Sequence, residues 1–136
     1  DIPCISTNIQ FQGGKIQFIG LHPKPPAPRN KVVNKDLEIL KAASMSNYNA
    51  YPSIVSGDLN DVGWSTITKE FKSTSGLLDP RIGRGFYNTY NALYPIFRVP
   101  IDHVFVSEHF KIYSIDKLRK IGSDHFPVLL KVNIEK

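Results

Sequence analysis

Hydrophobic and polar residues alternate in several short runs along the chain, and a clear example is KIQFIGL at residues 15–21. Alternation with a period of two predicts a strand that is buried on one face. This run stops at His22-Pro23, as expected where a proline removes the next backbone donor at the end of a strand. Similar strand-like runs lie at residues 1–11, 53–56, 100–107, 110–121 and 126–135.

Two other segments are expected to be helical. The first is a helix over residues 31–47, which follows the proline-rich loop at residues 23–30 and has Asn30 or Asn34 available as its N-cap. The second is short and starts after Ser65, a residue type that commonly caps helices. Because strands alternate with helices and no internal repeat is visible, we expect a layered domain of the α/β or α+β class. The apolar positions of the longer helix are Val33, Leu37, Leu40 and Ala43 or Ser44.

Polar side chains gather where the predicted strands begin or end. Such groups lose hydration when a strand is buried, unless they are paired or used in a site. Ligands bind at strand ends in layered α/β folds, so these residues are candidates for a functional site. They are His22, Asp58, Asn60, Asp102, Ser123, Asp124 and His125.

Composition narrows the class of protein. The chain has 136 residues, which suits one domain or part of one, and a formal net charge of +5, which favours a partner that carries phosphate. Its single cysteine, Cys4, excludes an internal disulfide and a cysteine-based zinc cluster. No stretch approaches the roughly 18 apolar residues that cross a bilayer, and no secretion signal is visible. These features leave the compartment open.

Three motifs in order, SGDLND at residues 56–61, PIDHVFVS at 100–107 and GSDHFPV at 122–128, follow an LHP at 21–23. Together they resemble the endonuclease/exonuclease/phosphatase superfamily of metal-dependent phosphoesterases, over essentially the whole chain. The resemblance implies a four-layer αββα sandwich. The segments GDLNDVGWS, DPRIGRG and FRVPIDHVFVS look most like a bacterial branch in which the domain follows an N-terminal membrane segment.

The resemblance also implies roles for five residues. His125 is expected to act as the general base that deprotonates water, with Asp102 holding its imidazole in the right tautomer. Asp58 is expected to position the water, and Asn60 to donate to the phosphoryl oxygens if the turn stays extended. His22 would contact the phosphate or assist the leaving group. Taken singly, Asp58 could be an ordinary turn residue and His125 could satisfy a buried carbonyl.

Asp124 is the expected ligand for Mg²⁺ or Mn²⁺, because these ions prefer a few carboxylates with water and substrate oxygens. Arg98 is a candidate for clamping phosphate oxygens, since a guanidinium matches them bidentately. Trp64 either borders the substrate, stacking on a base, or packs in the core. The remaining candidates are expected to be structural or solvated: Arg81, Arg84, His103 and His109.

One part of the family pattern has no counterpart in the sequence. The family domain has two similar halves, and the first supplies an asparagine and the glutamate that is the principal metal ligand. Residues 1–136 are therefore expected to be the C-terminal portion of one such domain, with the N-terminal half absent from the chain. A sheet face left open in this way would need that half or a homodimer mate to cover it. The glutamates whose context does not match the motif are Glu38, Glu70, Glu108 and Glu135.

The function expected from these motifs is metal-dependent hydrolysis of a phosphodiester or phosphomonoester, with nucleic acid as a possible substrate. The alternative within the enzymes is a phosphatase of phospholipids or sugar phosphates, which a membrane-tethered parent would favour. The alternative from another class is a non-catalytic module that binds phosphate or nucleic acid. The chain by itself is expected to be inactive, because the glutamate ligand is missing.

Overall fold

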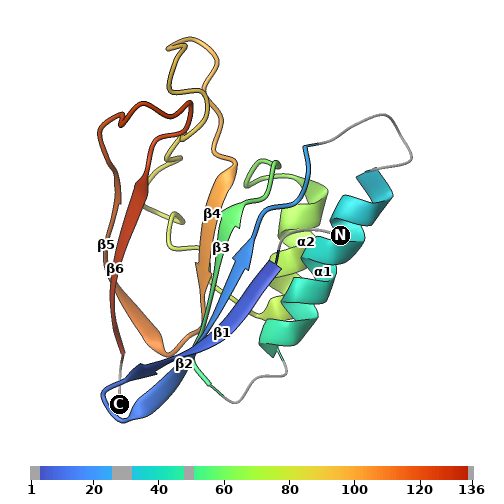
Figure 1. Cartoon of the computed structure of the whole chain (residues 1–136), viewed down its shortest axis with the longest axis vertical. Helices are drawn as coiled ribbons and strands as arrows, with labels where there is room; N and C mark the ends of the chain where they lie inside the picture. The colour runs from blue at the N-terminus through green and yellow to red at the C-terminus, as the bar shows by residue number, and fades with distance from the viewer. Residues whose placement is uncertain (1–3, 26–31, 48–50, 135–136) are drawn as a thin grey trace.

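The computed structural model describes residues 4–25, 32–47 and 51–134. Within them, strands and helices follow one another in the mixed order expected of an α/β fold, as Figure 1 shows. No helix in these ranges is both long and apolar enough to span a membrane. The elements are β1 (Cys4–Phe11), β2 (Gly14–Leu21), α1 (Val32–Asn47), β3 (Ser53–Asp58), α2 (Thr66–Ser75), β4 (Asp102–Val106), β5 (Phe110–Lys117) and β6 (Val128–Ile134).

The strands form two sheets. Four strands pair in the order β1-β2-β3-β4, and β5 pairs with β6 in a separate sheet. The β2–β3 pair is parallel and its connection includes α1, whereas the other pairs are antiparallel. In Figure 1 both helices lie on one side of the larger sheet and the β5–β6 sheet lies on the other. The described residues thus stack as helices, sheet and second sheet, consistent with the expected sandwich.

Two apolar clusters hold these layers together. Between the helices and the large sheet, Val55 and Phe105 are buried against Phe71 of α2. Between the two sheets, Val106 and Phe110 are buried, with partly buried side chains of both sheets around them. Because side chains alternate along a strand, β3 and β4 contribute to both clusters from opposite faces. The partly buried members are Ile54, Val104, Ile112, Leu130, Val132 and Ile134.

Both helices lie where the sequence predicted them, but one residue expected on the buried face of α1 is exposed. Leu37, expected on the buried face of α1, is 52% exposed, while Ile39, Ala42 and Ala43 are buried in the core. The prediction that Leu37 is buried was wrong, because the helix face that packs on the sheet is centred on Ile39, Ala42 and Ala43. Of the two candidate caps, Asn30 lies outside the described residues and Asn34 lies inside α1.

Ser65 caps α2 as predicted. Its side-chain oxygen accepts a hydrogen bond from the backbone N–H of Thr68 at 3.1 Å, which satisfies a donor that the first helical turn leaves free. The strand predictions are confirmed as well, but the runs at 100–107 and 126–135 begin later, at Asp102 and Val128, and the run at 110–121 ends at Lys117. Pro100 and Pro127 explain the later starts, since proline has no N–H for the sheet ladder.

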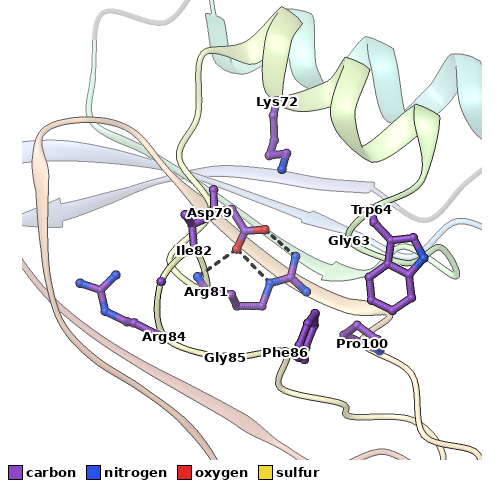
Figure 2. Close-up of a pocket in the computed structure, with 11 residues that line it drawn as sticks. Gly63, Trp64, Lys72, Asp79, Arg81, Ile82, Arg84, Gly85, Phe86 and Pro100 are labelled. Atoms are coloured by element: carbon purple, nitrogen blue, oxygen red, sulfur yellow. Dashed lines mark hydrogen bonds and ion pairs between the residues drawn. The ribbon is translucent and has the colours of Figure 1, made fainter.

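The connection between α2 and β4 is long, irregular and anchored at several points. Leu78 pairs with Val106 at the edge of β4, and Tyr90 forms isolated bridges with both Val99 and His125. Arg81 was expected to be solvated, but it is buried and forms an ion pair of 2.7 Å with Asp79, drawn in Figure 2. The loop is therefore a fixed part of the fold.

Gly57 lies where β3 passes close to its parallel neighbour β2. Its φ angle of 153° is one that L side chains rarely adopt. A Cβ atom at this position would lie 1.8 Å from the carbonyl oxygen of Leu21, far inside van der Waals contact. The glycine of the SGDLND motif is thus required by strand packing, and the residue after it is Asp58.

Replacing Gly57 with alanine should destabilise the fold. We expect Gly57→Ala to lower the free energy of unfolding by about 3 kcal/mol or more, because the added methyl group must push β2 and β3 apart and the backbone is strained. Chemical denaturation followed by circular dichroism measures this. Gly14→Ala on β2 is the matched control, since its Cβ would lie 3.6 Å from the nearest atom, the Phe11 carbonyl oxygen. Equal losses in the two variants would contradict the packing argument.

Candidate active site

Asp58 and Asp102 lie opposite each other at one end of the large sheet. Asp58 is the last residue of β3 and Asp102 the first of β4, and the antiparallel register pairs them. By alternation, both carboxylates share the strand face of Ile54 and Val104, which is the face toward the second sheet. The backbone N–H of Asp102 donates to the Thr89 hydroxyl at 3.4 Å, which ties this end of β4 to the long loop.

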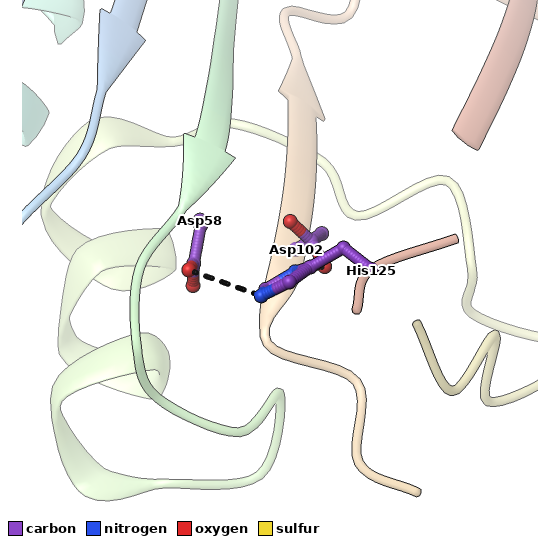
Figure 3. A group of neighbouring side chains, drawn as sticks. All are labelled: Asp58, Asp102 and His125. Carbon is purple, nitrogen blue, oxygen red and sulfur yellow. Dashed lines mark hydrogen bonds and ion pairs between the residues drawn. The ribbon is translucent and has the colours of Figure 1, made fainter. Parts of the chain in front are cut away.

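His125 reaches the two carboxylates from the segment that leads into β6. Its Nδ1 lies 2.8 Å from Oδ2 of Asp102, and its Nε2 lies 3.8 Å from Oδ2 of Asp58 (Figure 3). An ionised carboxylate can only accept, so Nδ1–H of His125 donates to Asp102. Nε2 of the neutral ring is then left as a proton acceptor on the side of Asp58.

The three groups change one another's acidity. Partial burial would lower the pKa of His125, but the hydrogen bond to Asp102 and the negative charges of Asp102, Asp58 and Asp124 outweigh it and raise the pKa. The pKa of Asp58 is raised chiefly by burial, with the charge of Asp102 adding to it, against the hydrogen bond from Asn60 and the charges of His125 and His22. Two carboxylates this close favour a cation between them.

Asn60 and His22 belong to neighbouring loops that are held together. Asn60 has a φ angle of 49°, so the turn after β3 is not extended, which was the condition for the role predicted for this residue. Its backbone N–H donates to Oδ1 of Asp58 at 2.7 Å, and its side-chain amide donates to the Pro23 carbonyl at 2.8 Å. His22 follows the end of β2, is exposed, and is near enough to Asp58 to lower its pKa.

The same three residues could hold a metal ion. One ligand atom from each of Asp58, Asp102 and His125 lies within 4.8 Å of the others. Two carboxylate oxygens and an imidazole nitrogen form a donor set that suits a divalent cation. Asp124 is not in this group; its exposed carboxylate lies 3.4 Å from the Ser123 hydroxyl, and its negative charge still acts on His125. Glu135 lies outside the described residues.

The two expected substrate contacts lie in different places. Arg98 is half-buried, with its guanidinium 4.9 Å from the centre of the Phe126 ring and its Nε 3.3 Å from the Asn91 carbonyl oxygen. Phe126 lines the cleft that contains Asp58, Asp102 and His125, so Arg98 is near the candidate site. Trp64 is 53% exposed, which rules out the core position left open by the sequence.

His103 has the structural environment expected of it. It points to the opposite face of β4 from Asp102, where its Nε2 donates to the Asp61 carbonyl and its Nδ1 accepts from Nη2 of Arg81, each at 2.8 Å. Because Arg81 can only donate, these bonds fix the neutral tautomer. Burial and the charge of Arg81 lower the pKa of His103 to about 4. His109 is exposed and lies 3.1 Å from the Ser107 hydroxyl.

A family model described as Endonuclease/Exonuclease/phosphatase family matches residues 2–125. This range contains every residue of the candidate site. The chain belongs to this family. A search of curated proteins found no match.

Solved structures show the same fold. A mannosyl-6-phosphatase from Bacteroides thetaiotaomicron superposes with a TM-score of 0.67 at 23% identity, covering 90% of this chain and 53% of its own. The human Nocturnin catalytic domain with a bound sulfate anion gives 0.75 at 19%, covering 98% and 53%. An endonuclease/exonuclease/phosphatase from Beutenbergia cavernae gives 0.79 at 18%, covering 98% and 39%. The chain therefore spans about half the length of these structures, or less.

The family motifs do not contain several residues that hold the site together. The ring of Tyr90 lies 4.9 Å, centre to centre, from that of His125, and the Thr89 carbonyl accepts from the N–H of Phe126 at 2.9 Å. Within the GSDHFPV motif, the Ser123 hydroxyl also accepts from the N–H of His125 at 3.0 Å. Sequence reasoning missed Thr89 and Tyr90, and the signal available was the aromatic character of the long loop.

The low pKa of His103 predicts a pH-dependent stability. In the unfolded chain His103 takes up a proton near pH 6.5, whereas in the folded chain it does so only near pH 4. The free energy of unfolding should therefore fall as the pH drops from about 6.5 to about 4. The loss of free energy of unfolding should reach about 3 kcal/mol. Denaturant unfolding at a series of pH values in a chelator measures it. In His103→Gln, which can keep both hydrogen bonds, this part of the pH dependence should vanish; parallel curves for the two proteins would contradict the prediction.

Proposed function

We propose that the protein hydrolyses phosphate esters, either phosphodiesters or phosphomonoesters, at the site formed by Asp58, Asp102 and His125. The observation that carries this proposal is the 2.8 Å hydrogen bond between His125 Nδ1 and Asp102, which leaves Nε2 free to accept a proton. Membership of the Endonuclease/Exonuclease/phosphatase family supports the same class of reaction.

In this mechanism His125 takes a proton from the attacking water through Nε2. Asp102 keeps the ring in the required tautomer and stabilises the imidazolium that forms, while the nearby Asp58 orients the water. The raised pKa of His125 makes its ring a stronger base. Asn60 has one amide hydrogen committed to Pro23 and a second for a phosphoryl oxygen, and His22 would serve the phosphate or the leaving group.

We propose Mg²⁺ or Mn²⁺ as the cofactor, held by carboxylates at this end of the sheet, with Asp124 as a ligand and the principal glutamate supplied from outside the chain. The closeness of the Asp58 and Asp102 carboxylates supports a cation here, with the ring of His125 left to act as the base. Such an ion supplies stabilisation of the charge on the phosphoryl oxygens. Arg98 would bind a further phosphate oxygen beside Phe126.

The enzyme can be tested with a chromogenic phosphodiester, with and without Mg²⁺, on the protein together with the rest of its family domain. His125→Ala should lower turnover by about 10²–10⁴-fold with little change in KM, because the general base is lost while substrate contacts remain. His109→Ala, at an exposed histidine away from the site, is the control and should keep normal turnover. Turnover that is unaffected in His125→Ala would contradict the assignment. Binding of phosphate compounds without any turnover would favour a non-catalytic module.

We also propose that residues 1–136 are the C-terminal portion of a family domain. The large sheet ends at β1, all of which is exposed, including Ile5 at 67%, Ile9 at 46% and Phe11 at 44%. An unpaired edge strand with apolar side chains invites further pairing. The chain spans 39–53% of the length of the structures described above. We therefore favour the rest of the same domain, over a homodimer mate, as the partner that covers β1.

This proposal predicts the state of the purified protein. We expect either a complex with the remaining half of the domain or a dimer, because the exposed edge and apolar strands should not stay open in water. Light scattering after size exclusion, with mass spectrometry of the same peak, measures the composition. A single species at the 15.3 kDa mass of one chain, with a cooperative melt, would contradict the proposal.

A further inference from the structure

A buried ion pair joins α1 to the loop that follows β3, and the proposed mechanism gives it no role. Nζ of Lys35 lies 2.8 Å from Oδ2 of Asp61. Lys35 is only 6% exposed, and lysine is rarely buried to this extent unless it is paired. In Figure 1 the beginning of α1 and the loop after β3 lie at the same end of the fold. The pair therefore connects the helix layer to the loop that carries Asn60.

The packing of α1 holds Lys35 in place. Lys35 lies one helical turn before Ile39, so both side chains belong to the same face of the helix. On that face Ile39, Ala42 and Ala43 are buried in the core. The Lys35 ammonium also lies 4.0 Å from the carboxylate of Asp36. The ammonium is thus a fixed charge at the beginning of a packed helix, unlike the charge of a solvated lysine.

Asp61 is bonded at three points, two through its carboxylate and one through its backbone. Oδ2 accepts from Lys35, and Oδ1 accepts from the N–H of Val62 at 2.9 Å. Its backbone carbonyl accepts from Nε2 of His103 at 2.8 Å. Lys35 belongs to α1 and His103 to β4, so two elements outside the loop fix the residue that follows Asn60.

The residue before Asn60 is fixed as well. Leu59 is 1% exposed in the core, and its N–H donates to the Ile101 carbonyl at 3.0 Å. Asn60 has a φ angle of 49°, in a region that asparagine tolerates better than most residue types. Such a backbone conformation persists only where the surrounding structure fixes it. The direction of the Asn60 side chain therefore depends on the anchors at Leu59 and Asp61.

Stability alone does not account for a buried ion pair at this position. Removing two charges from water costs free energy that their attraction repays only in part, and an apolar pair of similar volume is often as stable or more so. A charge-assisted hydrogen bond, however, fixes the distance and the angle between its two groups, which an apolar contact does not. The advantage of Lys35 and Asp61 over an apolar pair is a fixed geometry in the Asn60 loop.

We propose that Lys35 is a positioning residue, which acts through Asp61 to hold the side-chain amide of Asn60 in the direction needed to bind a phosphoryl oxygen. One hydrogen of this amide is committed to the Pro23 carbonyl at 2.8 Å, so a small rotation of the loop would misdirect the other. The proposal rests on the proposed function for the identity of the group that Asn60 serves. The ordering of the amide by Lys35 does not depend on hydrolysis.

The first test replaces Lys35 with methionine, which removes the ammonium and keeps an unbranched side chain. In the protein together with the rest of its family domain, Lys35→Met should lower kcat for a chromogenic phosphodiester by about tenfold or more, with little change in KM, because a group that acts in the transition state is misplaced. Lys41→Met, at an exposed lysine of the same helix, is the matched control and should keep normal kcat. Circular dichroism checks that both variants are folded. Normal kcat in folded Lys35→Met would overturn the proposal.

A second variant tests whether the effect passes through Asn60. Asn60→Gly removes the amide, and glycine adopts a φ angle of 49° without strain. It should lower kcat by about 10²-fold, as expected for the loss of one donor to the transition state. Adding Lys35→Met to Asn60→Gly should cause no further loss, because the group that Lys35 positions is already absent. Losses that multiply in the double variant would overturn the proposal.

An apolar replacement of the pair separates position from stability. Lys35→Met alone leaves the carboxylate of Asp61 without its partner, whereas Lys35→Met combined with Asp61→Leu removes that unpaired charge. The double variant should therefore regain free energy of unfolding relative to Lys35→Met, while its kcat stays low. Recovery of kcat together with stability would show that the ion pair only stabilises the fold.

Nuclear magnetic resonance distinguishes failure of this proposal from failure of the proposed function, because it needs no turnover. The order parameter of the Asn60 side-chain amide should be high in the unmodified protein and in Lys41→Met, and lower in Lys35→Met. An equally ordered amide in Lys35→Met would overturn the positioning role, whatever the turnover shows. A loosened amide in a protein that hydrolyses no phosphate ester would support the positioning of Asn60 and contradict the proposed function.

Discussion

The antiparallel register between β3 and β4 is the constraint on which the site depends. It pairs Asp58 with Asp102, so that both carboxylates end on one face of the sheet. A slip of one residue would turn one of these strands over, and would bring Leu59 or His103 to the face where a carboxylate now lies. Gly57 constrains the other side of β3, because it is the position at which β3 packs against the Leu21 carbonyl of β2 without room for a side chain.

Much of the fold could be predicted from the sequence because strand and helix periods are local signals. Alternation located β2, β3 and β4, and the ends of β4 and β6 could have been placed better from Pro100 and Pro127. The buried face of α1 was harder, since Leu37 and Ile39 both lie on plausible apolar stripes of the same helix. Packing against the sheet decides between them, and it buries Ile39.

The part of the site that could be predicted is the part that lies at strand ends, because ligands bind there in layered α/β folds. This expectation singled out Asp58, Asp102 and His125, and the structure brings them within hydrogen-bonding or ionic distance. It did not reveal that Tyr90 contacts His125, because this contact joins two irregular segments whose pairing has no local sequence signal. Arg81 was missed for a related reason: it lies in the irregular connection, and its burial depends on Asp79 and on His103 of β4.

The two histidines beside β4 show how one strand separates two chemical environments. His103 lies on the helix side, where burial and the Arg81 guanidinium keep its ring neutral at ordinary pH. His125 approaches from the sheet side, where carboxylates raise its pKa. Their positions could not be exchanged without cost, since a basic ring beside Arg81 would bury a second positive charge. The alternation of Asp102 and His103 along β4 therefore keeps the buried neutral ring of His103 apart from the ring of His125, which Asp102 holds by a hydrogen bond.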